Sequence, residues 1–142
     1  MTAKEWLQRG WRLEREINTL EEAKRRAYDR CISSTTRADS VPGGTASNFT
    51  LNDKMSAYAN FAALVDERID ELVRVKTEVM EVIRKVDDTT LRTLLIARYI
   101  NFRTWEQIAV EMNYSYQHVC RLHGTALRMI QDVIVCYTPP VL

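Results

Sequence analysis

The sequence has little glycine and proline, with four and three residues respectively in 142. No stretch alternates apolar and polar residues in the way that half-buried strands do. Apolar residues nevertheless make up 46% of the chain, which is enough for a folded core and argues against disorder. These features exclude a β-rich fold and predict an all-α protein.

Cysteine is also scarce, because only Cys31, Cys120 and Cys136 are present and they lie far apart. Their spacing matches no zinc or redox motif, so we expect thiols outside any disulfide. The two histidines, His118 and His123, have no cysteine or carboxylate at ligand spacing. We therefore expect no metal site and no cofactor.

Long apolar runs are missing as well. No segment approaches the ~20 apolar residues of a membrane span, and the first residues do not resemble a signal peptide. We therefore expect a cytoplasmic protein with no membrane partner. The sequence also has no glycine-rich phosphate loop, no nucleophile elbow and no defensible pair of carboxylates, so no catalytic residue is predicted and no enzyme is expected.

The N-terminal part is predicted to begin with one long helix over residues 2–33. Its apolar residues recur at alternating spacings of three and four, with Gly10 and Lys24 as poor members of the stripe. Residues 34–50 follow as a predicted linker, because they are rich in Ser and Thr and contain a Pro-Gly-Gly step.

A second long helix is predicted over residues 51–86, with Thr50 or Asn52 as its cap. Its mainly apolar stripe runs from Met55 to Val86 in an unbroken alternation of three and four residues, with Lys76 as a charged member. A stripe sustained for more than four heptads is typical of a coiled coil. The simplest arrangement is an antiparallel hairpin in which the first helix folds back on the second.

Such a hairpin has a narrow core and leaves other apolar side chains on its outer faces. A third or fourth helix should cover them, either from the C-terminal part or from a second copy. We expect a homodimer through these helices, because symmetric dimers are the commonest oligomers. The residues concerned are Leu7, Trp11, Phe61, Leu64 and Val73.

The C-terminal part, from Leu91 to Ile130, is predicted to form three short helices. Thr104 and Gln107 have the spacing of a capping box, and Ser115 can cap the last helix after a tight turn. Helical periodicity predicts two faces for this last helix. The buried face holds Val119, Leu122, Ala126, Leu127 and Ile130, and the other face holds Gln117, Cys120, Arg121, Gly124 and Arg128.

Two short capped helices joined by a tight turn are typical of a helix-turn-helix, whose second helix commonly enters the DNA major groove. The segments LRTLLIARYI, TWEQIAVEM and YSYQHVCRLHGTAL resemble region four of sigma-70-type transcription factors. The whole chain is similar to small phage and prophage proteins of Gram-positive bacteria, including ArpU-type late-gene activators. The sigma-like likeness covers about the last third of the chain.

This resemblance implies a set of DNA-binding residues. Gln117 would pair with adenine and Arg121 with guanine, while Cys120 stands where sigma factors usually have a basic residue. His118, Arg98, Arg103 and Arg128 would contact phosphates, against an alternative of ordinary solvation for the arginines. The predicted DNA-binding residues are Ser115, Tyr116, Gln117, His118, Cys120, Arg121, Arg103 and Arg128.

The charge of the chain is close to neutral, at +1. Residues 91–142 carry only five basic and three acidic side chains. Because phosphate contacts supply most non-specific affinity for DNA, this segment should bind DNA poorly by itself. It would need a dimer, or host RNA polymerase as a co-binder.

These observations predict an N-terminal oligomerisation or partner-binding arm over residues 1–88, a DNA-binding domain over 89–136 and a tail over 137–142. The expected function is transcription regulation on double-stranded DNA, as a phage or prophage late-gene activator. Two alternatives stay open. One is a small-terminase-like packaging adaptor, and the other is a sigma-like module that binds polymerase without contacting DNA.

Overall fold

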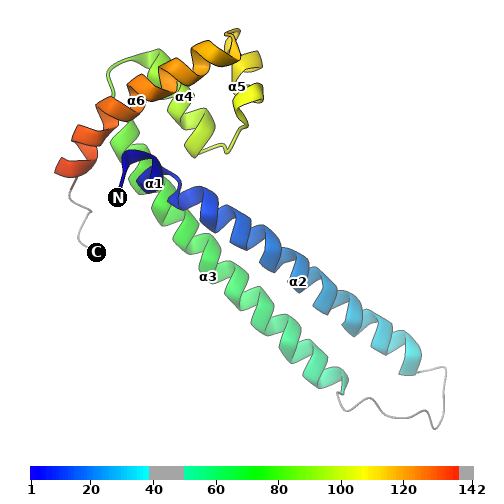
Figure 1. The fold of residues 1–142 in the computed structure, drawn as a ribbon. Coiled ribbons are helices and arrows are strands. Elements are labelled where there is room, and N and C mark those ends of the chain that lie inside the picture. Colours follow the sequence, from blue (N-terminus) through cyan, green and yellow to red (C-terminus); the bar gives the residue numbers. More distant parts are fainter. Residues whose placement is uncertain (39–49, 138–142) are drawn as a thin grey trace. The chain divides into compact units, whose positions relative to one another are not determined.

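A computed structural model of the chain describes residues 1–38 and 50–137. Its described part contains helices and no strand, which confirms the all-α class (Figure 1). The helices are α1 (Ala3–Leu7), α2 (Arg9–Ala38), α3 (Leu51–Ile83), α4 (Thr89–Tyr99), α5 (Trp105–Met112) and α6 (Tyr116–Cys136). Within the described ranges, no helix combines the length and apolar character needed to cross a bilayer.

The chain divides into two compact units. Unit 1 consists of Met1–Leu13 and Leu72–Leu142, and unit 2 consists of Glu14–Glu71. The borders fall inside α2 and α3, so each of these helices contributes to both units. The functional division at residue 88 stays a prediction, and residues 138–142 of the predicted tail lie outside the described residues.

The first predicted helix is divided in the structure. Gln8 is a turn residue between α1 and α2, and its backbone stays in the right-handed region with φ −75° and ψ −4°. Next to this break, the carbonyl of Trp6 accepts a hydrogen bond from Arg9 Nε at 3.0 Å. Thr2 and Glu5 form a capping box that starts α1. The prediction of one continuous helix was therefore wrong at this step.

The predicted linker begins too early. Helix α2 continues through residues 34–38, which were assigned to the linker, while residues 39–49 lie outside the described residues. Ser and Thr lower helix stability only by fractions of a kcal/mol each, roughly 0.5 relative to Ala, so they do not end a long helix. The stronger breaker in this segment is the Pro-Gly-Gly step that begins at Pro42.

The second long helix begins where it was predicted to begin. Thr50 Oγ1 accepts a hydrogen bond from the backbone N–H of Asp53 at 3.2 Å, so Thr50 is the cap. The Asp53 carboxylate accepts hydrogen bonds from the backbone and the hydroxyl of Thr50, and these bonds lower the pKa of that carboxyl group. Helix α3 ends at Ile83, a turn before the predicted end at Val86, which is buried all the same.

In unit 2, α2 and α3 lie side by side and run in opposite directions (Figure 1). Two contacts define their alignment. The ring centres of Tyr28 and Tyr58 are 5.6 Å apart, and Arg68 Nε lies 3.5 Å from Glu16 Oε1. Among the residues of this unit whose side chains the structure describes, the buried apolar ones are Ile17, Ala27 and Val65, and each stands at a stripe position of its helix.

In unit 1, the main core joins the two ends of the sequence. Leu7, which the sequence placed on an outer face, is fully buried with Val82 and Ile83 of α3 and Ile130 of α6. The backbone N–H of Ala3 donates to Gln131 Oε1 at 2.9 Å, which fastens α1 to α6. The N-terminal residues are thus part of the structure that supports α6.

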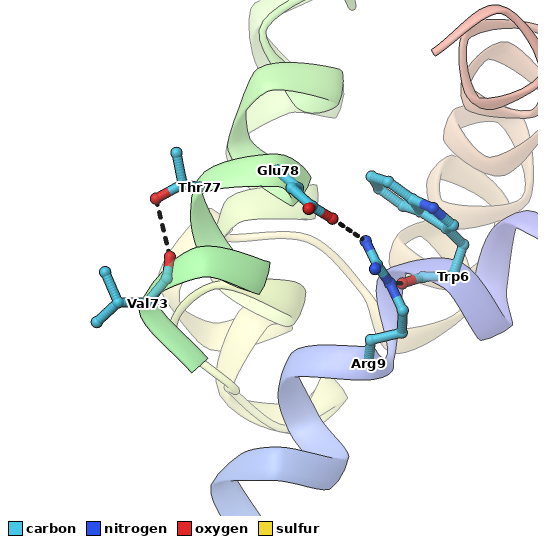
Figure 2. A network of polar contacts seen from close by, with 5 residues as sticks. All are labelled: Trp6, Arg9, Val73, Thr77 and Glu78. Carbon is cyan, nitrogen blue, oxygen red and sulfur yellow. Dashed lines mark hydrogen bonds and ion pairs between the residues drawn. The ribbon is translucent and has the colours of Figure 1, made fainter. Parts of the chain in front are cut away.

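A second attachment within unit 1 involves Arg9, at the start of α2 (Figure 2). Arg9 Nη2 lies 3.0 Å from Glu78 Oε2 of α3, and the guanidinium group lies 4.4 Å from the centre of the Trp6 ring. Both members of the ion pair are less than one-third exposed. Stacking and charge pairing together hold the arginine in one orientation.

Gly10, a poor member of the predicted stripe, has a packing role. A Cβ atom built on it would lie 3.5 Å from Phe102 Cζ and 3.8 Å from Leu72 Cδ1. Phe102 itself has a left-handed backbone with φ 56°, which a bulky residue rarely adopts. The Phe102 ring also contacts Lys76, whose Nζ lies 4.8 Å from the ring centre. These contacts hold the α4–α5 connection in place.

Replacing Gly10 with Ala should raise the free energy of unfolding by about 0.5–1 kcal/mol, because Ala restricts the unfolded chain and suits a helix better. The distance of 3.5 Å to Phe102 is ordinary van der Waals contact, so the methyl group fits. Urea unfolding measures the difference. Gly10→Leu is the contrasting variant and should be destabilised, because its larger side chain collides with the Phe102 ring. A destabilised Gly10→Ala would contradict the packing described.

Candidate nucleic-acid interface

Helix α5 begins with the predicted capping box. Thr104 Oγ1 accepts a hydrogen bond from the backbone N–H of Gln107 at 3.2 Å, and Gln107 Oε1 accepts one from the backbone N–H of Thr104 at 2.9 Å. Two backbone groups that a helix terminus would leave unbonded are satisfied reciprocally. The prediction of this cap from the Thr-to-Gln spacing is confirmed.

The turn between α5 and α6 is short because its backbone reverses at Asn113. This residue has φ 58°, and asparagine tolerates the left-handed conformation better than most residues. The next N–H, of Tyr114, donates to the carbonyl of Ala109 at 3.0 Å. Ser115 then caps α6 through a hydrogen bond from the His118 N–H at 3.1 Å, as predicted.

Three fully buried side chains hold α4, α5 and α6 together. Leu94, Ile108 and Val119 come from the three helices in turn, and each has 0% exposure. Ala97, Trp105, Ala109, Met112 and Leu122 pack around them. Because Val119 must face this cluster, the rotation of α6 about its own axis is fixed near its start.

The opposite face of α6 is open to solvent. Gln117, Cys120, Arg121 and Arg128 are exposed, as the periodicity predicted. Gly124 has no side chain to add bulk to this face. The space around it is open, since a Cβ atom at this position would have no other atom within 4 Å. Spacings of four, three and four residues align Gln117, Arg121, Gly124 and Arg128 along one side of the helix. This side offers an amide and two guanidinium groups to a partner.

The first turn of α6 contains Tyr116 and His118, which differ in their freedom. Tyr116 is 49% exposed, and the neighbouring Cys120 is the largest influence that raises the pKa of its hydroxyl group. Its hydroxyl therefore keeps its proton and can donate a hydrogen bond. The His118 ring instead packs edge-on against Tyr114, with 4.7 Å between ring centres, and is half-buried.

Some of the arginines that were predicted to bind phosphate make polar contacts within the protein. Arg103 Nε lies 3.6 Å from Glu111 Oε1 of α5, and Arg98 donates to the Arg103 carbonyl at 2.9 Å. Arg128 donates a hydrogen bond to Thr125 Oγ1 of its own helix at 3.3 Å. Arg121 and Arg128 thus share the outer side of α6, whereas Arg103 is paired with α5.

His123 of α6 contacts residues of both α4 and α5. Its Nε2 lies 2.6 Å from the hydroxyl of Tyr99 of α4, and its ring centre lies 4.4 Å from that of Trp105 of α5. Burial raises the pKa of Tyr99 to about 12 and lowers the pKa of His123 to about 4. Tyr99 is therefore the donor and neutral His123 the acceptor.

The role of Tyr99 was missed in the sequence analysis, where its only signal is an aromatic residue in the first of the three predicted C-terminal helices. Arg98 stacks on the same tryptophan, since its guanidinium group lies 4.4 Å from the Trp105 ring centre.

In the part of the chain that the structure describes, no three His, Cys, Asp or Glu side chains are grouped so that they could hold a metal ion.

Acid should destabilise the fold through His123. Its pKa is about 4 in the folded chain against an ordinary value of 6.5, so the unfolded chain binds more protons between these values. The contribution is complete above pH 6.5 and is lost as the pH falls towards 4. Partial exposure of the ring limits the loss to about 1–2 kcal/mol.

Thermal unfolding of wild type and His123→Gln between pH 7 and pH 4 measures this contribution, because glutamine can accept the Tyr99 hydrogen bond and does not titrate. The stability of His123→Gln should depend less steeply on pH than that of wild type. His118→Gln removes the other histidine and serves as the matched control. Equal pH dependence in wild type and His123→Gln would show that His123 is not held neutral by the fold.

Comparison with known proteins gives a family for the chain. No curated protein and no solved structure matches it significantly. One family model matches residues 30–131, which include the C-terminal end of α2, all of α3, α4 and α5, and most of α6. The chain therefore belongs to the family described as "Protein of unknown function (DUF1492)".

Proposed function

We propose that the protein is a DNA-binding transcription regulator and that α5, the turn and α6 act as a helix-turn-helix. The observation that supports this most is the outer side of α6. It presents Gln117 and Arg121 to solvent while Val119 is fully buried behind them. A capped helix with one side fixed and two base-pairing side chains on the other is suited to enter a major groove.

The residues have distinct roles in this proposal. Gln117 pairs with adenine and Arg121 with guanine, the two bases whose major-groove edges match an amide and a guanidinium group. Tyr116, Arg128 and the Ser115 end of α6 contact the backbone, where hydroxyl and cationic groups bind phosphate oxygens. Cys120 is exposed between them and adds only a soft contact.

Low net charge makes a second contact necessary. With a formal charge of +1, the chain has weak electrostatic attraction to DNA. Recruitment with host RNA polymerase, as in a late-gene activator of a phage or prophage, supplies that contact through effective concentration. The sigma-like and ArpU-like resemblance supports this part of the proposal.

One observation favours a second candidate, a sigma-like module that binds polymerase without contacting DNA. On the outer side of α5, Val110 is 78% exposed, and Glu106 and Glu111 lie beside it. An apolar side chain between two carboxylates is suited to a protein surface and unsuited to phosphates. The first candidate requires Arg121 for DNA binding, and the second does not.

Selection of bound duplexes from a random pool at low salt, followed by fluorescence anisotropy, tests the first candidate. Arg121→Ala should weaken binding to the selected site by about 1–3 kcal/mol and relax the preference at one base pair, because a bidentate contact to guanine is lost. Arg84→Ala is the matched control, because the Arg84 side chain lies just after the end of α3 and is 67% exposed. The affinity of this variant for DNA should stay at the wild-type value.

The selection is repeated with host RNA polymerase present. A sequence preference that appears only with polymerase and is lost in Arg121→Ala still supports base contacts by α6. Polymerase binding without any sequence preference would favour the second candidate. If no duplex is retained with or without polymerase, the transcription proposal fails.

A further inference from the structure

Unit 2 exposes more large apolar side chains than it buries. In its described part, the buried apolar residues are Ile17, Ala27 and Val65. Those that are at least 37% exposed are Tyr28, Ile32, Leu51, Met55 and Ile69. Long helices in proteins are stabilised mainly by packing of their apolar faces, so a unit of this composition lacks a second apolar layer.

Most of these exposed side chains line one groove between α2 and α3. Its volume is ≈ 420 Å³, and its lining includes Tyr28, Ile32, Leu51, Met55 and Tyr58. A second hollow of ≈ 340 Å³ shares the two tyrosines and is otherwise lined by Glu21, Lys24 and Arg25. The two hollows form one surface, called the tyrosine face below. It is apolar at one end and charged at the other.

The charged side chains beside this face are of both signs, so two copies of the face can be complementary to each other. Arg25 and Asp29 stand one helical turn apart on α2, on either side of Tyr28 in the sequence, and both are exposed. Neither forms an ion pair with any residue that the structure describes. A two-fold axis crossing α2 at the level of Ala27 would bring Arg25 of each copy to Asp29 of the other.

The same axis is compatible with α3. Because Tyr28 and Tyr58 are neighbours, the level of Ala27 on α2 corresponds to the level of Ala59 on α3. The axis then places Met55 of one copy beside Ala62 and Ala63 of the other. Met55 is 55% exposed, and the small alanine side chains leave room for it.

We propose that two copies of this chain bind each other through their tyrosine faces, with antiparallel hairpins related by a two-fold axis near Ala27 and Ala59. A second copy fits this surface better than a partner of one charge sign, which would leave either Arg25 or Asp29 without a counter-charge. This pairing supplies the apolar layer that unit 2 lacks. It does not depend on DNA binding.

Charge reversal tests both the surface and the orientation. Sedimentation equilibrium of the full chain should show a wild-type dimer, and Arg25→Glu or Asp29→Arg alone should raise its dissociation constant on the order of tenfold or more, because like charges then meet across the axis. The double variant Arg25→Glu/Asp29→Arg should restore the wild-type constant, since each new glutamate meets a new arginine.

Arg26→Glu is the matched control. It makes the same charge change one residue along α2, on a side chain that is 68% exposed and paired with Glu22, and it should leave the dimer intact. Met55→Glu should weaken the dimer, and circular dichroism should show unchanged helix content because Met55 is exposed in the single chain. A monomeric wild type, a Met55→Glu dimer of wild-type strength, or a double variant weaker than both single variants would overturn the proposal.

Discussion

The contact among Leu94, Ile108 and Val119 is the constraint on which the proposed interface depends. Each of the three helices α4, α5 and α6 contributes one of these side chains, and all three are completely buried. Val119 stands in the second turn of α6 and must face inwards, so Arg121, roughly 200° further around the helix, must face outwards. The buried contact thereby determines which polar groups a partner meets.

The N-terminal residues belong to the same mechanical support. Leu7 fills the main core, Ala3 is hydrogen-bonded to Gln131 of α6, and Arg9 pairs with Glu78 of α3. Unit 1 is therefore discontinuous in sequence, and its C-terminal helices do not bury their apolar faces without the first residues of the chain. Removing those residues would expose the apolar side of α6, although they are far from this helix in the sequence.

Features governed by neighbouring residues could be predicted from the sequence. The helical class, the caps at Thr50, Thr104 and Ser115, and the inner and outer sides of α6 follow from spacing and side-chain type, and the structure agrees with them. Features governed by distant contacts could not. Burial of Leu7 and the left-handed Phe102 depend on tertiary packing. In the candidate site, the exposed residues were predictable, but the partners that hold Arg103, His118 and His123 were not.

The central claim is that a nucleic acid meets the outer side of α6. Two-dimensional amide NMR of the full chain, titrated with a selected DNA duplex, tests it directly. The largest changes in amide chemical shift are expected at Gln117, Cys120 and Arg121, and a smaller change is expected at the buried Val119 of the same helix. Shifts confined to the α5 surface around Val110, with none on the outer side of α6, would contradict it.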